Sequence, residues 1–255
     1  MDPPADEFPA VQPGGSLLLA WQVRNRRVLV VGGGNVAAGR ILNLLNADAL
    51  ITVVTPAAGL VPEVAHRISQ NLITHIDRNF LPTDLEDPAI AMVLTAVDDP
   101  LASSTIYTLC KQKRIPVNVA DVPPECDFYF GSVHRDGPLQ IMVSTNGNGP
   151  KLANIVRRQI AATLPANLGE AVVKVGALRK RLRGIAPAPA EGPKRMDWMT
   201  RVCEGWSLEE LCDMNEEDME ALLKGYGDGV VISYKELRGE QDAIAEGFDG
   251  SFGWV

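Results

Sequence analysis

The sequence predicts an α/β protein in which a parallel sheet comes first, a small central β/α region follows and the remainder is helical. Two observations predict this class. Apolar runs alternate with helical patterns over residues 16–120, and the alternation stops at about residue 120. Strands that alternate with helices form βαβ units with right-handed crossovers, which build a parallel sheet.

The apolar runs of the N-terminal part are short and continuous, as expected for strands buried on both faces of a parallel sheet. The predicted strands span residues 28–31, 50–54, 72–76, 89–94 and 116–119. The predicted helices span residues 37–45, 61–70 and 102–113. The alternation of the two kinds of element is the basis of the predicted fold class.

The pattern changes after residue 120. The β-prone segments 127–132 and 139–143 have no helix between them, only the turn-rich stretch HRDGP, so we expect an antiparallel pair. After the loop STNGNGP, apolar residues recur at helical spacing on two faces. The first face carries Leu152, Ile155, Val156 and Ile160, and the second carries Leu168, Val172, Val175, Leu178 and Leu182.

The C-terminal part is expected to be helical beyond a linker rich in Pro, Ala and Gly at residues 184–192. Ser207 and Glu210 form a capping box, and Asn215 begins a further helix that ends near Gly225. The chain is therefore divided into domains 1–120, 121–165 and 166–240 and a tail at 241–255. Within the first of these, residues 1–15 are expected to be a disordered arm.

The composition excludes several classes of protein. Hydrophobic residues make up 46% of the 255 residues and charged residues 22%, which is typical of a globular protein. No apolar run reaches the roughly 18 residues that cross a bilayer. The acidic, proline-rich N-terminus lacks the basic start and apolar core of a signal peptide, so a cytoplasmic location is expected. The four cysteines fit no zinc or CxxC spacing and are expected to be ordinary thiols.

The net charge of −8 argues against a nucleic-acid binder, but the charge is uneven along the chain. Residues 151–183 carry eight basic side chains and one acidic side chain, whereas residues 184–255 carry six basic and 16 acidic ones. A short cationic segment in an acidic protein suits a polyanionic small ligand. The alternative, in which these charges are the solvated faces of two helices, stays open.

The segment VLVVGGGNVA, residues 28–37, carries the phosphate-binding pattern of a Rossmann unit that binds a dinucleotide. Gly32, Gly34 and Ala37 form GxGxxA between a buried strand and a helix, and a second strand follows about twenty residues later. Gly32 permits the tight turn, Gly34 lets the backbone approach the pyrophosphate, and Ala37 keeps the helix close to the sheet. The phosphates then meet the helix N-terminus. A glycine turn with a purely structural role is the alternative.

The rule that separates NAD from NADP does not decide between them here. The second strand ends in Val-Val-Thr-Pro, without an Asp or Glu for a ribose hydroxyl and without an Arg for a 2′-phosphate. Thr55 is the hydrogen-bonding group at that point. Thr95 and Ala96 are expected near the nicotinamide, and Asp98 and Asp99 are expected to cap the next helix. The predicted cofactor-binding residues are Gly32, Gly34, Asn35, Val36, Thr55, Pro56, Ala57, Thr95 and Ala96.

Four segments together resemble the dehydrogenase–chelatase module of siroheme synthases, in its stand-alone fungal form. They are VRNRRVLVVGGGNVAAGR at 23–40, TAVDDP at 95–100, VNVADVPPECDFYFGS at 117–132 and IMVSTNGNGP at 141–150. The resemblance covers residues 16–183 and weakens in the acidic C-terminal helices, and no methyltransferase domain follows as in the fused bacterial enzymes. The family's loop usually carries a further serine before the proline, where this chain has Gly149.

The resemblance implies two reactions. NAD⁺ takes a hydride from precorrin-2 while a proton leaves, giving sirohydrochlorin, and Fe²⁺ then replaces two pyrrolic protons to give siroheme. In the family one aspartate after the Asn-Val motif serves both steps, and its position here is Asp121. A carboxylate beside a cofactor can accept protons. The alternative for Asp121 is a turn residue ahead of Pro123 and Pro124.

The resemblance also implies how the tetrapyrrole and a second subunit bind. The loop at 144–149 and the following helix, with Arg157 and Arg158, would receive the carboxylates of the substrate. The predicted substrate-binding residues are Asn118, Ser144, Thr145, Asn146 and Lys151. Asn118 either orients the substrate or holds its turn. The family is a homodimer whose subunits exchange the strands that follow the Rossmann domain.

No preformed metal site is expected. His66, His75 and His134 are assigned to a helix, a strand and a hairpin loop, and none pairs with a Cys or carboxylate at ligand spacing. Asp127 either handles metal or substrate or opens a strand. We therefore expect a bifunctional NAD-dependent dehydrogenase and ferrochelatase with Fe²⁺ as substrate. A dehydrogenase without chelatase activity and a non-catalytic NAD-sensing module are the alternatives.

Overall fold

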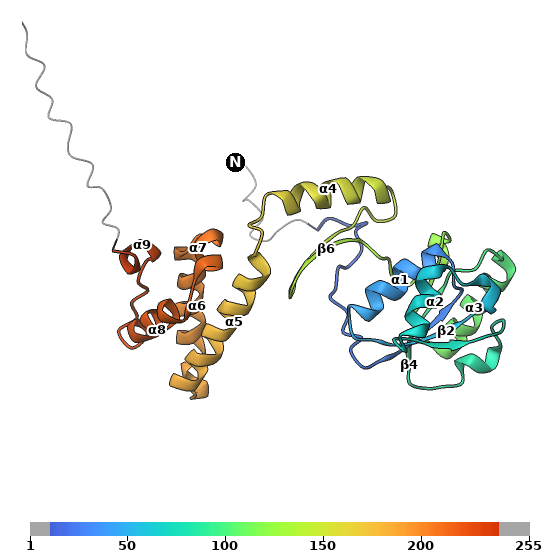
Figure 1. Ribbon diagram of the computed structural model, residues 1–255, viewed down its shortest axis with the longest axis horizontal. Coiled ribbons are helices and arrows are strands. Elements are labelled where there is room, and N and C mark those ends of the chain that lie inside the picture. Colours follow the sequence, from blue (N-terminus) through green and yellow to red (C-terminus); the bar gives the residue numbers. More distant parts are fainter. Residues whose placement is uncertain (1–10, 240–255) are drawn as a thin grey trace, which may run out of the picture. The chain divides into compact units, whose positions relative to one another are not determined.

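The computed structural model describes residues 11–239, and the chain forms two units (Figure 1). The first unit runs through Phe130 and also takes in Asn146–Gly149. The second comprises Gly131–Thr145 and the chain from Pro150 onward. The central hairpin and the C-terminal helices therefore belong to one unit.

The first unit contains a five-stranded, all-parallel sheet in the order β3-β2-β1-β4-β5. Its strands are β1 (Arg27–Val31), β2 (Leu50–Val54), β3 (Thr74–Ile76), β4 (Ile90–Thr95) and β5 (Val117–Val119). Its helices are α1 (Asn35–Leu45), α2 (Pro62–Ser69) and α3 (Pro100–Lys113), with short 3-10 turns η1 (Ala57–Gly59), η2 (Pro82–Leu85) and η3 (Pro123–Glu125). The strand order reverses direction between β1 and β4, which is where ligands bind in such sheets.

Both faces of this sheet are covered, because successive side chains of each buried strand point to opposite faces. Val28 and Val30 of β1 pack in one core with Ile41 of α1, whereas Leu29 and Val31 pack in the other with Ile106 of α3. Helices α1 and α2 therefore cover one face and α3 covers the other. The predicted α/β class with a parallel Rossmann sheet is confirmed.

The second unit begins with an antiparallel hairpin of β6 (Ser132–Asp136) and β7 (Leu139–Val143), against which α4 (Pro150–Ala162) packs. The prediction of a strand at 127–132 was wrong. The strand lies five residues later, because Gly137, with a φ of 54°, and Pro138 make a two-residue turn and HRD joins the strand. His134 consequently lies in β6 and not in a hairpin loop.

Residues 126–128 lie instead along the edge of β5. The backbone N–H of Asp127 donates to the carbonyl oxygen of Val117 at 2.9 Å, and its carboxylate accepts from the N–H of Val117 at 3.0 Å. The carboxylate of Asp127 also pairs with Lys111 at 2.6 Å. Asp127 therefore opens no strand, and its contacts fasten the chain to the sheet.

The rest of the second unit is helical, as expected. The helices are α5 (Leu168–Ile185), α6 (Gly192–Gly205), α7 (Leu208–Asp213), α8 (Glu216–Gly225) and α9 (Tyr234–Leu237), with a 3-10 turn η4 (Pro189–Glu191). They share one core, which includes Leu178, Leu182, Trp198, Val202, Met214 and Leu222. The capping box of Ser207 with Glu210 and the helix that starts after Asn215 and ends at Gly225 are confirmed.

Two predictions about the termini have different outcomes. Residues 1–10 of the expected arm and the tail at 241–255 lie outside the described residues. Residues 11–15 form no helix or strand, but the carbonyl oxygen of Gly14 accepts a hydrogen bond from Asn146 at 3.0 Å, so this end of the arm is attached. Among residues 11–239, no helix is long and apolar enough to cross a membrane.

Candidate functional site

The glycine loop after β1 is fixed by backbone hydrogen bonds to two neighbouring strands. The N–H of Gly32 donates to the carbonyl oxygen of Val54 at 3.1 Å, and the N–H of Ala96 donates to that of Val31 at 2.8 Å. A Cβ at Gly32 would lie 2.1 Å from the carbonyl oxygen of Ala96, and its φ is 112°. No other residue fits this position.

Gly33, which the motif leaves unassigned, is as closely packed. A Cβ there would lie 2.9 Å from a methyl carbon of Leu60 and 3.0 Å from the carbonyl oxygen of Gly59. The carbonyl oxygen of Gly33 accepts from the N–H of Val61 at 2.9 Å. The GxGxxA pattern treats this position as variable, so sequence reasoning missed it.

The start of α1 fits a pyrophosphate. No side chain caps this end, where Gly34 is the N-cap residue, and a Cβ at Gly34 would meet no atom within 4 Å. Asn35 and Val36, the first two residues of the helix, are exposed. An uncapped helix N-terminus beside open space can receive phosphate oxygens on its N–H groups.

The end of β2 is held by an acidic residue that the prediction did not use. The N–H of Ala57 donates to the carboxylate of Asp77, which directly follows β3, at 2.6 Å. Thr55 is 6% exposed, and with Pro56 it lines a cavity of about 490 Å³ bounded by α3. Asp77 lies next to β2 only because β3 pairs with β2, so its position depends on the sheet order.

Asp121 lies at the carboxyl end of β5, two strands from the glycine loop. It is exposed and adopts a left-handed φ of 60° in the turn that precedes η3. The N–H of Ala120 donates to the carbonyl oxygen of Thr95 at 2.9 Å, which fixes this turn to the end of β4. The turn role considered for Asp121 is therefore real, and it presents the carboxylate at the ligand-binding edge of the sheet.

Arg40 of α1 is a residue of this edge that sequence reasoning missed. Its guanidinium donates to the carbonyl oxygen of Thr95 at 3.1 Å and lies 5.7 Å from the ring centre of Phe130. Burial lowers the pKa of Arg40, while the charges of Cys126 and Asp121 act in the opposite direction. The interaction with Asp121 places this half-buried cation near the turn that carries the carboxylate. Nothing in the spacing of Arg40 from the glycines indicates this contact.

Asn118 and Thr95 are buried at the same edge. The amide nitrogen of Asn118 donates to the carbonyl oxygen of Phe128 at 2.7 Å and to the sulfur of Cys126 at 3.3 Å, so Asn118 holds the turn. The amide oxygen of Asn118 and the hydroxyl of Thr95 are buried without a partner among the described residues. Such unpaired groups are costly and are often found at ligand sites. Ala96 is partly exposed beside them.

The predicted caps and substrate residues are distributed over both units. Asp99 caps α3 by accepting from the N–H groups of Leu101 at 2.9 Å and Ala102 at 3.0 Å, whereas Asp98 caps no helix within residues 11–239. Asn146 belongs to the first unit and also bonds the hydroxyl of Ser16. The remaining predicted substrate residues, Ser144, Thr145 and Lys151, belong to the second unit and lie just before and at the start of α4.

The described part of the chain contains no group of three or more His, Cys, Asp or Glu side chains that could hold a metal ion. His66 lies in α2 and His75 in β3, where its ring nitrogen is 2.8 Å from the carbonyl oxygen of Thr55. The four cysteines form no disulfide, and burial raises the pKa of Cys110 to about 12. These thiols are protonated at neutral pH and are poor metal ligands in that form.

Comparisons with known proteins identify the family. The chain matches models described as "Putative NAD(P)-binding" over residues 19–132, "Sirohaem biosynthesis protein central" over 136–163 and "Sirohaem biosynthesis protein C-terminal" over 165–232. It is 55% identical to a siroheme biosynthesis protein of Schizosaccharomyces pombe, over 91% of this chain and 88% of that protein. The chain belongs to the siroheme biosynthesis protein family. The resemblance seen in the sequence is thus confirmed.

A second sequence relative agrees with that assignment, and a solved structure shares the fold. A siroheme biosynthesis protein of Saccharomyces cerevisiae is 32% identical, over 82% of this chain and 90% of that protein. The solved structure named SirC, precorrin-2 dehydrogenase, has a TM-score of 0.61 at 18% identity and covers 84% of this chain and 100% of that one. At this identity the likeness to SirC shows a shared fold.

Proposed function

We propose that this protein is an NAD-dependent dehydrogenase that oxidises precorrin-2 to sirohydrochlorin. One observation carries the proposal: the glycine loop and the Asp121 turn lie at the same edge of one sheet, bonded to each other through β4. Membership in a siroheme biosynthesis family supplies the class of substrate. The name of the SirC structure, precorrin-2 dehydrogenase, supports the choice of reaction.

The oxidation removes two electrons and two hydrogens from the macrocycle. Bound NAD⁺ would accept one hydrogen together with its electron pair, that is, as a hydride. We assign the other hydrogen, which leaves as a proton, to the carboxylate of Asp121, the catalytic base. A carboxylate that touches the macrocycle can accept this proton as the hydride departs.

The binding roles follow from the same proposal. The dinucleotide phosphates meet Gly32, Gly34, Asn35 and Val36, its ribose lies against the turn of Thr55, Pro56 and Ala57, and its nicotinamide lies against Thr95 and Ala96. The substrate carboxylates meet Ser144, Thr145, Asn146 and Lys151, with Arg157 and Arg158 of α4. Asn118 contributes by holding the Asp121 turn, since its amide nitrogen is engaged with the chain.

We further propose ferrochelatase activity at the same site. Two relatives named siroheme biosynthesis proteins are covered over 88% and 90% of their length, so this chain spans most of what those proteins contain. Insertion of Fe²⁺ exchanges one metal ion for two pyrrolic protons, which Asp121 accepts in turn. The macrocycle supplies the ligands, because residues 11–239 contain no metal-binding cluster.

The second unit supports a homodimer. Its hairpin has only two strands, and apolar side chains of the hairpin and α4 are exposed to between 37% and 57%, namely Val133, Leu152, Ile155 and Ile160. The hairpin is supported by α4. A second copy in a symmetric interface would bury the apolar side chains that this packing leaves exposed. We place this dimer in the cytoplasm, without a nucleic-acid partner.

An anaerobic assay tests the proposal. Protein, precorrin-2 and NAD⁺ are mixed and the absorption spectrum is followed, with NADP⁺ in a parallel reaction. We expect the spectrum of sirohydrochlorin together with NADH, at a higher rate than with NADP⁺. Addition of Fe²⁺ or Co²⁺ should then convert sirohydrochlorin to its metal complex.

The outcomes separate the alternatives. An unchanged spectrum with NAD⁺ bound, as measured by calorimetry, would leave a dinucleotide-sensing module and refute the dehydrogenase. Oxidation without metal insertion above the rate of a protein-free control would refute the chelatase and leave a dehydrogenase alone.

A further inference from the structure

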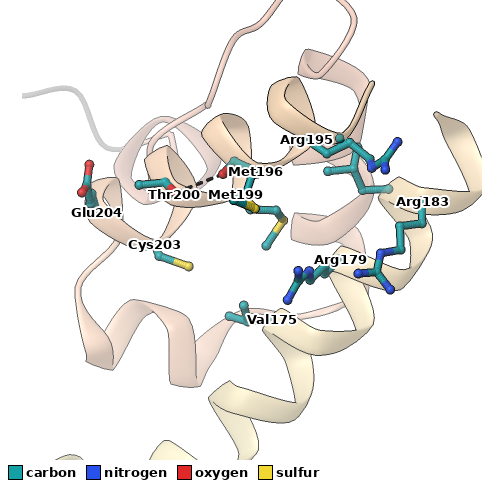
Figure 2. A pocket seen from close by; sticks show the side chains of 11 residues that line it. Val175, Arg179, Arg183, Arg195, Met196, Met199, Thr200, Cys203 and Glu204 are labelled. Atoms are coloured by element: carbon teal, nitrogen blue, oxygen red, sulfur yellow. Dashed lines mark hydrogen bonds between the residues drawn. The ribbon is translucent and has the colours of Figure 1, made fainter. Parts of the chain in front are cut away.

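A groove of about 690 Å³ lies between α5 and α6 in the second unit, and no step of the proposed reaction uses it. Arg179 and Arg183 line it from α5, and Arg195 lines it from the first turns of α6. Figure 2 shows these three arginines gathered at one end, with Cys203 and Glu204 at the other.

Two of these arginines have no partner within residues 11–239. Arg179 and Arg183 make no hydrogen bond or ion pair there, whereas Arg181 on the same helix pairs with Glu216. The third, Arg195, is fixed by the carbonyl oxygens of Ala186 at 2.5 Å and Ala188 at 2.9 Å. Residues 184–239 carry 12 acidic side chains, and within residues 11–239 none of them pairs with Arg179 or Arg183.

The floor of the groove is apolar. Leu182, which is fully buried, and Met199, which is 9% exposed, come from the core of the helical region. Met196 is 66% exposed at the rim, although a methionine usually lies inside. A hollow with an apolar floor and a few charged groups at one end is typical of a small-molecule site.

We propose that this groove binds an organic polyanion, one that carries two or more carboxylates or phosphates at one end of an apolar body. The anionic end pairs with the forks of Arg179, Arg183 and Arg195, and the apolar body lies on Leu182 and Met199. Arginine forks suit carboxylate and phosphate oxygens because they offer two parallel N–H donors. Glu204 at the opposite end sets the orientation by repelling the anionic groups.

The first test is a titration of the full chain with bis-ANS, which carries two sulfonates on an aromatic body, in the presence of saturating NAD⁺. The double variant R179Q/R183Q should weaken this binding about tenfold. Thr200→Trp, which fills the rim without a change of charge, should weaken it as well. The matched control is Lys180→Gln, an exposed cation of α5 outside the groove, which should bind as wild type does.

Equal affinity of R179Q/R183Q and Lys180→Gln would overturn the proposal, provided that circular dichroism and the melting temperature show all variants folded. Competition then identifies the source of the anion. Coproporphyrin carries four carboxylates on a macrocycle, and ATP carries phosphates. Whichever of the two displaces bis-ANS better shows whether the groove prefers carboxylates or phosphates. Citrate, which has the charge without the apolar body, should not displace it.

Cys203 gives a second, site-specific measurement. Burial and the nearby Glu204 raise the pKa of its thiol, so alkylation by iodoacetamide is followed at pH 8.5 by peptide mass spectrometry. The bound probe should slow the alkylation of Cys203 and leave Cys212, outside the groove, unchanged. Failure of this protection would refute binding in the groove, whatever the dehydrogenase assay shows.

The chain's own residues 240–255 are the competing occupant, since they carry four acidic side chains and three aromatic ones. If removal of these residues alone speeds the alkylation of Cys203, they fill the groove and the small-molecule proposal is wrong. Equal rates with and without these residues, together with protection by bis-ANS, support the proposal.

Discussion

The two units of this chain place their candidate binding groups by different means. In the first unit these groups follow the carboxyl ends of strands, and backbone hydrogen bonds from Gly32 to Val54 and from Ala120 to Thr95 fix them. In the second unit, Arg179 and Arg183 reach their groove from the surface of a helix. A site built on the backbone can be predicted from a sequence motif. A site built between helices cannot be predicted in this way, because it depends on which helices pack together.

The largest expected effect is at Asp121, in the candidate site of the first unit. Asp121→Asn should lower the rate of precorrin-2 oxidation by about 10²–10⁴-fold, because a neutral amide cannot accept the proton. The affinity for NAD⁺, measured by calorimetry, should stay within about twofold, since in the proposed reaction the carboxylate meets the substrate and not the phosphates. The control is Asp98→Asn, an exposed carboxylate at the same edge with no partner within residues 11–239.

Full turnover by Asp121→Asn would contradict the catalytic role and leave Asp121 as a turn residue. Equal losses in both variants would show that charge at this edge of the sheet matters and the position of the carboxylate does not.

Gly32 and Gly34 separate the structural and the binding parts of the same loop. Gly32→Ala should destabilise the first unit by about 3 kcal/mol, because its Cβ would clash with the carbonyl oxygen of Ala96 at a positive φ. Gly34→Ala has open space and a φ of −78°, so stability should change by less than about 1 kcal/mol. Its affinity for NAD⁺ should nevertheless fall about tenfold or more, since the Cβ would occupy the space that we assign to the pyrophosphate.

Hydrogen exchange of peptides from each unit measures the loss of stability in Gly32→Ala, and calorimetry measures the loss of NAD⁺ affinity in Gly34→Ala. Protection should fall in the sheet of Gly32→Ala and stay unchanged in α5–α8. Loss of protection in both units would show that they do not unfold separately.

The sequence was sufficient for the parallel sheet because its signals are local. The buried runs ending at Val31, Val54 and Thr95 and the glycines between them required no knowledge of distant contacts. The hairpin was misplaced because a turn of only Gly137 and Pro138 follows a strand whose last three residues are the polar His, Arg and Asp. A search for apolar runs does not detect a half-exposed strand that contains several polar side chains.

The missed site residues share one physical cause. Arg40 meets Thr95, and Asp77 meets Ala57, only after the sheet has assembled in its particular order. The arginine groove likewise exists only because α5 packs on α6. The charge count located an excess of cations at 151–183 but could not tell which of them would find partners, such as Arg181, and which would not.

Each unit contains a buried carboxylate that accepts two hydrogen bonds from one arginine. The contribution of such a pair to stability can therefore be compared between the two units. Asp84 accepts from Arg78 at 2.6 and 2.8 Å, and Asp218 accepts from Arg238 at 2.5 and 2.7 Å. These hydrogen bonds lower the pKa of both carboxyl groups. Asp84→Asn and Asp218→Asn should each cost about 2 kcal/mol, and each should affect its own unit in hydrogen exchange.

The pH dependence has a definite sign. A carboxyl whose pKa is lowered in the folded protein stabilises it above the unfolded pKa of about 3.9, and this contribution disappears as the pH falls through the folded value. Urea unfolding of the wild type should therefore show stability falling below about pH 4. Both variants should show a shallower fall, and an unchanged slope would mean that the ion pairs contribute nothing to acid unfolding.

The smallest expected effects come from the helix caps, and one cap from each unit can be compared. Asp99 caps α3 in the first unit, and Ser207 caps α7 in the second, where its hydroxyl accepts from the N–H of Glu210 at 3.2 Å. Asp99→Ala and Ser207→Ala should each lower the free energy of unfolding by about 1 kcal/mol, because two N–H groups at the start of α3 and one at the start of α7 lose their acceptor. Since α7 has only six residues and α3 has 14, the Ser207 variant should also raise local exchange of α7, whereas α3 should lose protection only in its first turn. Equal local effects at the two helices would show that length does not set their dependence on the cap.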